Sequence, residues 1–317
     1  MNHVKFLTAT LLFYFIIDHS CSQPSGFSGN VSFAATTPCN EEVKQMLNIP
    51  GGVNCEMMKW SLSLYRDDKN VPSAFDLTYK YGSPKQGTKG FREGEKTTVL
   101  KGQWAIRKAK IAGSDKNVIT LTPGNASGSL SFLQASENLL HLLKEDGTPM
   151  VGDAAWSYTL NNTNPVFIST GPFLAKELPS TGIISETDTV AVFVGRTPCS
   201  ESLRKLNNIT AEGCQLIKCR LILLQDKKTQ SPLNFVIQTI YVGMGDNKYS
   251  VTGRWKVMQG ITTDPTAIIY QLLPDSPQPG NELLLLTCGD HILFFLDKNS
   301  QLLVGNDYCS YTLNREK

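Results

Sequence analysis

The feature that most constrains this chain is an internal repeat of domain length. Residues 33–39 recur as residues 193–199, with Phe, Thr, Pro and Cys at matching places, 160 positions later. Residues 151–161 recur as residues 304–314 at a spacing of 153 positions, with Val-Gly and Ser-Tyr-Thr-Leu-Asn in common. Each copy is about as long as an ordinary domain, so the pattern predicts two copies of one domain.

The repeat also sets the expected domain boundaries. The stretch between the two copies contains Gly-Pro and Pro-Ser-Thr-Gly, as is typical of a linker. We expect a signal peptide, a tether, a first domain, a linker and a second domain at residues 1–20, 21–30, 31–164, 165–187 and 188–317, respectively.

Within each copy, hydrophobic residues recur with a period of two, which is typical of β-strands. Phe75, Leu77 and Tyr79, for example, alternate with polar residues. Strands of roughly five to eight residues between turn clusters predict an all-β fold, either an antiparallel sandwich or a barrel. A small up-and-down barrel of about eight strands fits the length of each copy.

Each copy also contains one short predicted helix. Asn40 and Ser200 stand at positions where their side chains can cap a helix. Val43 and Leu47 then share one face of the first helix, and Leu203 lies behind the cap of the second. Because each helix falls between two cysteines, we expect it to plug one end of its barrel.

The amino-terminal segment has the pattern of a secretory signal peptide. Lys5 precedes an apolar run at residues 6–17 that is too short to span a bilayer. Cys21 follows this segment directly and is the candidate for lipid attachment, which would give the protein a membrane partner. Ordinary cleavage near Ser20 or Ser22 is the alternative. The formal charge of +2 contains no long basic block, so no nucleic-acid partner is expected.

Eight cysteines in an exported chain favour disulfides. Cys39 and Cys55 occupy the same places in the first copy as Cys199 and Cys214 in the second, so we predict a bond within each pair. Closing a loop of this size stabilises the folded state by about 3 kcal/mol in the chain-entropy estimate.

A third disulfide is predicted from the comparison of the copies. Cys219 and Cys309 stand where the first copy has Trp60 and Trp156. If these positions lie on the first and last strands of a closed barrel, they are neighbours. We therefore predict a Cys219–Cys309 bond that replaces a contact between two tryptophans, with coincidence as the alternative.

The sequence gives little support to catalysis. Cys288 has no cysteine counterpart, since Ala135 stands at its place, and a lone buried thiol is usually a core residue. His141 and His291 fall at non-equivalent positions, and the chain has no Gly-x-Ser-x-Gly, His-x-x-x-His or phosphate-binding motif. We expect no catalytic residues.

The aromatic residues offer a candidate binding site. The four tryptophans either belong to the core or line a pocket for one small ligand. They are Trp60, Trp104, Trp156 and Trp255. The basic loop at residues 83–101 is the best candidate for a surface contact, with a solvated hairpin as the alternative.

Taken together, several short motifs resemble the N-terminal domain of the NlpE family of bacterial envelope lipoproteins. They are Cys21, Gly195-x-Thr197-Pro198-Cys199, residues 221–226, residues 249–255 with Gly-x-Trp, and residues 293–302 with Leu-x-x-Leu-Asp. The resemblance implies a lipocalin- or streptavidin-like β-barrel in each copy. It also implies an outer-membrane lipoprotein associated with copper homeostasis and envelope stress.

The sequence departs from that family at its Cys-x-x-Cys pair, because Cys39 and Cys55 lie far apart. A Cu(I) site would need these thiols in reduced form, with Met57 and Met58 as further soft ligands, so no cofactor is expected. We interpret the chain as a non-enzymatic binding, sensing or scaffold module whose partner is an envelope protein or a small ligand. A copper-handling or thiol-redox protein and a lipocalin-like carrier of an apolar ligand are the alternatives.

Overall fold

The computed structural model describes residues 29–124, 128–167, 175–178, 187–210, 212–261, 263–275 and 281–316. The predicted signal peptide and Cys21 lie outside these ranges, so their roles stay predictions. Within them, the chain is all-β apart from two short helices. Neither of these helices is long and apolar enough to cross a membrane.

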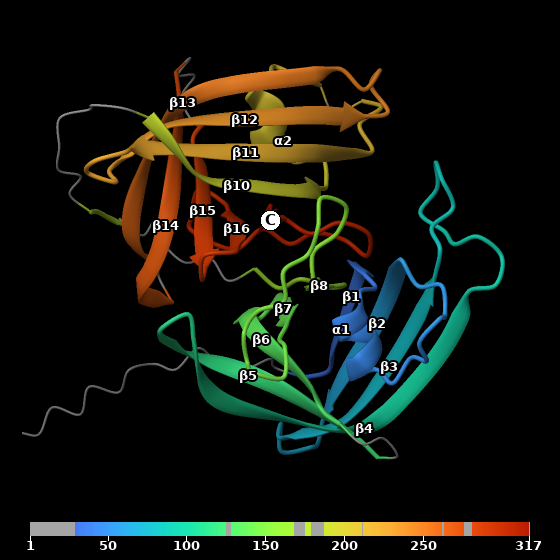
Figure 1. Ribbon diagram of the computed structural model, residues 1–317. Coiled ribbons are helices and arrows are strands. Elements are labelled where there is room, and N and C mark those ends of the chain that lie inside the picture. Colours follow the sequence, from blue (N-terminus) through green and yellow to red (C-terminus); the bar gives the residue numbers. More distant parts are fainter. Residues whose placement is uncertain are drawn as a thin grey trace, which may run out of the picture.

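The first copy of the repeat forms a closed antiparallel barrel (Figure 1). Its strands follow one another around the barrel in sequence order, and pairing of the first strand with the eighth closes it. The elements are β1 (Val31–Pro38), α1 (Glu41–Met46), β2 (Met57–Arg66), β3 (Pro72–Gly82), β4 (Lys96–Ile111), β5 (Ser114–Pro123), β6 (Leu130–Ser136), β7 (Leu139–Leu142) and β8 (Thr159–Asn162).

The second copy repeats this topology, with β10 paired to β17 and β12 paired to β13. Its elements are β10 (Thr187–Thr197), α2 (Glu201–Lys205), β11 (Leu216–Asp226), β12 (Pro232–Val242), β13 (Lys248–Ile261), β14 (Asp264–Pro274), β15 (Leu283–Cys288), β16 (Ile292–Leu296) and β17 (Thr312–Arg315). The predicted all-β fold of two barrels is therefore confirmed, and the sandwich alternative is wrong.

The segment expected to be a linker also contributes to the second sheet. β9 (Lys176–Glu177) lies within it and pairs with the outer edge of β13. β10 begins at Thr187, one residue before the predicted start of the second domain.

Side-chain alternation determines what fills each barrel. Leu62 and Leu64 of β2 and Phe75 and Leu77 of β3 are fully buried in one cluster that occupies the first barrel. An equivalent cluster, which includes Phe235, occupies the second. The interior of each barrel is therefore a packed hydrophobic core.

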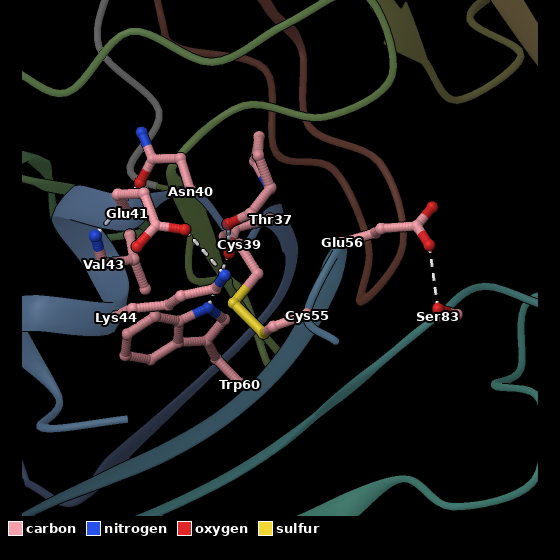
Figure 2. The surroundings of a disulfide bond; sticks show 11 residues. Thr37, Cys39, Asn40, Glu41, Val43, Lys44, Cys55, Glu56, Trp60 and Ser83 are labelled. Carbon is pink, nitrogen blue, oxygen red and sulfur yellow. Dashed lines mark hydrogen bonds and ion pairs between the residues drawn. A yellow bond between two sulfur atoms is a disulfide. The ribbon is translucent and has the colours of Figure 1, made fainter. Parts of the chain in front are cut away.

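A capped helix and a disulfide lie at one end of the first barrel (Figure 2). Asn40 caps α1 by accepting a hydrogen bond from the Val43 amide at 3.0 Å, and Val43 is completely buried. Cys39 and Cys55 form the predicted disulfide, with their Cα atoms 5.5 Å apart. Close to this bond, the Trp60 indole donates a hydrogen bond to the Thr37 hydroxyl at 2.8 Å.

The second barrel has the matching arrangement. Ser200 caps α2 by accepting from the Leu203 amide at 3.3 Å, and Leu203 is buried. Cys199 and Cys214 form the second predicted disulfide. The predicted helix, cap and bond are thus confirmed in both copies.

The predicted Cys219–Cys309 bond is wrong, because both residues are buried free thiols. The prediction counted Trp60 as part of the first strand, but β1 precedes it and Trp60 lies on β2. Residue 156 precedes β8 rather than lying within it. In the second barrel, Cys219 faces the core from β11, and Cys309 lies in the segment before β17, so β10 separates the two positions.

The two barrels pack against each other through their last strands. Every residue of β7, β8 and β16 is buried, although only one face of each strand points into its own barrel. The other face contacts the opposite barrel (Figure 1). A third hydrophobic cluster fills this junction and takes members from both barrels, such as Leu139 and Ile292.

Candidate functional site at the junction of the two barrels

A cleft of about 270 Å³ lies between the barrels and is lined by both of them. Its apolar floor includes Leu133 and Ala135 from β6 of the first barrel. Leu286, Cys288 and Phe294 of the second barrel complete the floor. This hollow is the candidate ligand site, because both barrels form it and its lining combines apolar side chains with polar ones, as small-molecule pockets commonly do.

An ion pair between Lys116 and Asp264 lies at the edge of the cleft and joins the β4–β5 hairpin to the β13–β14 hairpin. Burial acts to raise the pKa of the Asp264 carboxyl, but hydrogen bonds from Lys116 and Thr266 outweigh it, so the pKa lies below its usual value. The carboxylate therefore stays ionised at neutral pH. The pair supplies a polar edge that belongs to both barrels.

Cys288 forms part of the cleft floor but is not an activated thiol. Burial raises its pKa to about 11, although the nearby Lys116 acts to lower it. At neutral pH the thiol therefore remains protonated, whereas the thiolate is the nucleophile and the metal ligand. Its role here is to pack against the junction cluster, in which Ala135, its counterpart in the repeat, also takes part.

His141 lies at the centre of the junction. Its Nε2 is 2.8 Å from the carbonyl oxygen of Met150, and its Nδ1 is 2.9 Å from the hydroxyl of Thr159. A carbonyl can only accept, so Nε2 carries the proton of the neutral ring. Burial lowers the pKa of His141 to about 4, so the ring is neutral at physiological pH. The rings of His141 and Phe294 meet edge to face, with their centroids 5.6 Å apart.

A second hollow of about 240 Å³ lies elsewhere along the junction. Its lining includes Asn161 and Asn162 of β8 and Asn306 and Asp307 of the second barrel. The Thr36 hydroxyl donates a hydrogen bond across the junction to the carbonyl of Asp307 at 2.8 Å.

The four tryptophans predicted as core or pocket residues divide into two groups. Trp60, Trp104 and Trp255 are buried within the barrel cores. Trp156 instead lies at the junction, where its ring meets Tyr308 edge-on at 6.5 Å. The guanidinium of Arg196 lies 5.6 Å from the centre of the Trp156 ring.

The basic loop predicted at residues 83–101 is shorter in the structure, because residues 96–101 belong to β4. The part before β4 reaches the second barrel. The Lys89 ammonium lies 5.5 Å from the centre of the Tyr308 ring, a cation–π contact between the barrels. The loop therefore helps to join the two barrels.

The residues considered for Cu(I) are arranged differently from a thiolate site. Cys39 and Cys55 are bonded to each other, and Met57 and Met58 are buried beside them in sequence at the start of β2. In the part of the chain that the structure describes, no three His, Cys, Asp or Glu residues gather to hold a metal ion.

The sequence pattern does not reveal Lys116, Asp264 and Phe294 as members of a site. Each makes its contact with a residue of the other copy, and such pairing leaves no local pattern. The available signal was the strong similarity of residues 151–161 to residues 304–314, because these segments adjoin the junction.

Comparisons with known proteins give one match. No protein-family model matches the chain, and no curated protein does. Among solved structures, a crystal structure of the Cpx pathway activator NlpE from Escherichia coli matches with 12% sequence identity and a TM-score of 0.24, over 79% of this chain and 93% of that chain. At this identity and TM-score the match gives no support to a shared function.

Proposed function

We propose that this protein is an exported, lipid-anchored envelope protein that acts as a non-enzymatic binding or scaffold module. The observation that carries the proposal is the position of the cleft at the junction of the two barrels. The barrel interiors are packed with side chains, whereas the cleft is made by both barrels together. Binding is therefore assigned to the two-barrel unit, with a small amphiphilic molecule or an apolar side chain of a partner protein as the occupant.

The chemistry of the cleft supports binding rather than catalysis. Lys116 and Asp264 neutralise each other, and the raised pKa of Cys288 keeps its thiol protonated. His141 does not line the cleft; it uses both ring nitrogens in hydrogen bonds and is completely buried. General acid–base catalysis needs a group with a pKa near the working pH and within reach of a substrate.

The two alternative functions have less support. A lipocalin-like carrier needs an open barrel interior, but Trp60, Phe132 and Leu160 are among the side chains that fill the first barrel. A copper-handling or thiol-redox role would require reduction of the Cys39–Cys55 bond before its sulfur atoms could bind Cu(I).

Lipid attachment at Cys21 can be tested on protein extracted from membranes. Mass spectrometry of the amino-terminal peptide should find an acylated cysteine at position 21, and a Cys21→Ser variant should lose both the lipid and the membrane association. A mature protein that begins at another residue without a lipid would disprove the anchor.

Binding in the cleft can be tested by methyl NMR with indole, a small apolar probe that carries one donor. We expect shifts confined to the methyl groups of Ile111, Leu133 and Leu286, which line the cleft. An Ala135→Phe variant, which fills the cleft, should abolish them. The matched Ala105→Phe variant alters an exposed position on β4 and should retain them. Equal shifts in the two variants would contradict the proposal.

A further inference from the structure

Three contacts across the junction join residues that are counterparts in the repeat. The hydroxyls of Ser157 and Ser310 are 2.6 Å apart, and those of Thr159 and Thr312 are 3.0 Å apart. The third contact is the ring pair of His141 and Phe294. The members of each pair are 153 positions apart in sequence. A residue that touches its own counterpart must lie near the axis that relates the two copies, so the junction contains a pseudo-two-fold axis.

Contacts away from the axis occur in reciprocal sets. Asn161 accepts a hydrogen bond from the Gly305 amide at 2.8 Å and donates one to the Asn306 carbonyl at 2.8 Å. Asn314, the counterpart of Asn161, accepts from the amide of residue 152 at 2.9 Å and donates to the carbonyl of residue 153 at 3.2 Å. Each asparagine thus binds the same two backbone groups on the opposite barrel. This reciprocity defines an isologous interface, of the kind found in symmetric dimers.

The glycines of this motif make the close approach possible in both copies. A Cβ at Gly152 would lie 2.2 Å from the carbonyl oxygen of Trp156 and 3.0 Å from the Asn314 side chain. At Gly305 it would lie 2.1 Å from the Cys309 carbonyl oxygen and 2.9 Å from the Asn161 side chain. The same steric requirement therefore acts on each side of the junction.

The apolar part of the junction follows the same symmetry. The apolar cluster contains several counterpart pairs, and each pair contributes one member from each barrel. Among them are Leu133 with Leu286, Leu139 with Ile292, and Leu143 with Leu296.

We infer that the outward face of β7 and β8, together with residues 151–157, is a homotypic docking surface. This surface fits the second barrel of its own chain. The other partner that it fits is the same surface on a second copy of the protein. In a pair of first barrels, Ser157 would meet Ser157 and Thr159 would meet Thr159. Asn161 of each barrel would bind the backbone of residues 152–153 of the other barrel. The side chains of Ser157, Thr159 and Asn161 would therefore all keep hydrogen-bond partners.

The intact chain satisfies this surface internally. Two barrels joined by a short linker encounter each other at an effective concentration on the order of millimolar. Closed monomers are therefore favoured until the linker is cut. Pairing with a second copy then becomes possible, although it lacks contacts between unlike residues such as the Lys116–Asp264 ion pair.

The test uses the full chain with a protease site placed within residues 179–186. All variants also carry Cys309→Ser, so that no natural thiol lies beside the introduced one at the axis. Ser157→Cys is introduced alone, and the folded chain is cut and kept under mild oxidation. The homotypic surface predicts a covalent dimer of first halves, joined through the introduced thiol at position 157, and uncut chains should remain monomeric. Ser61→Cys, at an exposed position on β2, is the matched control and should give no dimer.

Exchange of halves is measured in parallel so that either result is informative. Cut Ser157→Cys chains are mixed with cut Ser310→Cys chains, and urea is raised until a disulfide joins first halves to second halves. Near-UV circular dichroism verifies that the barrels stay folded under those conditions. The mixed disulfide shows that halves have exchanged between chains. If it forms, but the cut Ser157→Cys chains give no more dimer of first halves than the Ser61→Cys control under the same conditions, the inference is overturned.

Discussion

Acidification should destabilise this protein through His141. The ring is completely buried, and burial lowers its pKa from 6.5 to about 4. In the unfolded chain the pKa returns to its ordinary value of about 6.5. Between these two values the unfolded state binds more protons than the folded state. Stability therefore rises with pH in this window, and it is lost as pH falls from 6.5 toward 4.

The size of this effect follows from the two pKa values. Protonation linkage gives a loss of roughly 2.4 kcal/mol in the free energy of unfolding between pH 7 and pH 4.5. Replacing His141 by Phe, the residue at its counterpart position 294, should remove this contribution. His291→Gln, a change at the exposed histidine, serves as the matched control.

The assay is urea unfolding monitored by tryptophan fluorescence at both pH values. The contributions of other titrating groups cancel when the pH dependence of a variant is subtracted from that of the natural protein. We expect the His141→Phe variant to lose most of the difference and the His291→Gln variant to retain it. The same pH dependence in the His141→Phe variant and the natural protein would refute the reasoning.

Three further predictions concern the disulfide and the cleft. Replacing Cys39 and Cys55 together by Ala should lower the free energy of unfolding of the first barrel by about 3 kcal/mol, and chemical denaturation that shows no change would contradict a stabilising bond. The Cys288 thiol is buried and has a pKa of about 11, so it should resist maleimide at pH 7 and react only once the protein unfolds. Rapid labelling of the folded protein would contradict this prediction. Lys116→Met leaves Asp264 without its cation, so it should cost about 1–3 kcal/mol and raise the carboxyl pKa; an unchanged NMR titration of Asp264 would exclude the ion pair.

Much of the fold could be predicted because its determinants are local or repeated. The alternation of Phe75, Leu77 and Tyr79 marked a strand, and all three side chains are buried in the first barrel. The equivalent positions of Cys39–Cys55 and Cys199–Cys214 predicted both disulfides correctly.

The error over Cys219 and Cys309 arose from counting strands. The strand before the helix was not included in the count, and this displaced Trp60 from the second strand to the first. Because neighbours in a barrel depend on strand order, this displacement, together with the placement of residue 156 on the last strand, made two separated positions look adjacent.

The junction could not be derived from local pattern, because its contacts join residues such as Lys116 and Asp264 that lie on different copies. The repeat nevertheless contained a trace of it. Residues 151–161 and 304–314 are among the most similar segments of the two copies. In an isologous interface the same residues must fit on both sides, which explains why Asn161 and Asn314 kept the same identity.

The most direct test of the account is non-reducing peptide mapping of protein extracted from native membranes, which reads the state of every cysteine at once. We predict acylated Cys21, disulfides within the Cys39–Cys55 and Cys199–Cys214 pairs, and free thiols at positions 219, 288 and 309. Free thiols at both predicted pairs, with no lipid on Cys21, would contradict an anchored module built on structural disulfides, and thiol or metal chemistry would become the better explanation.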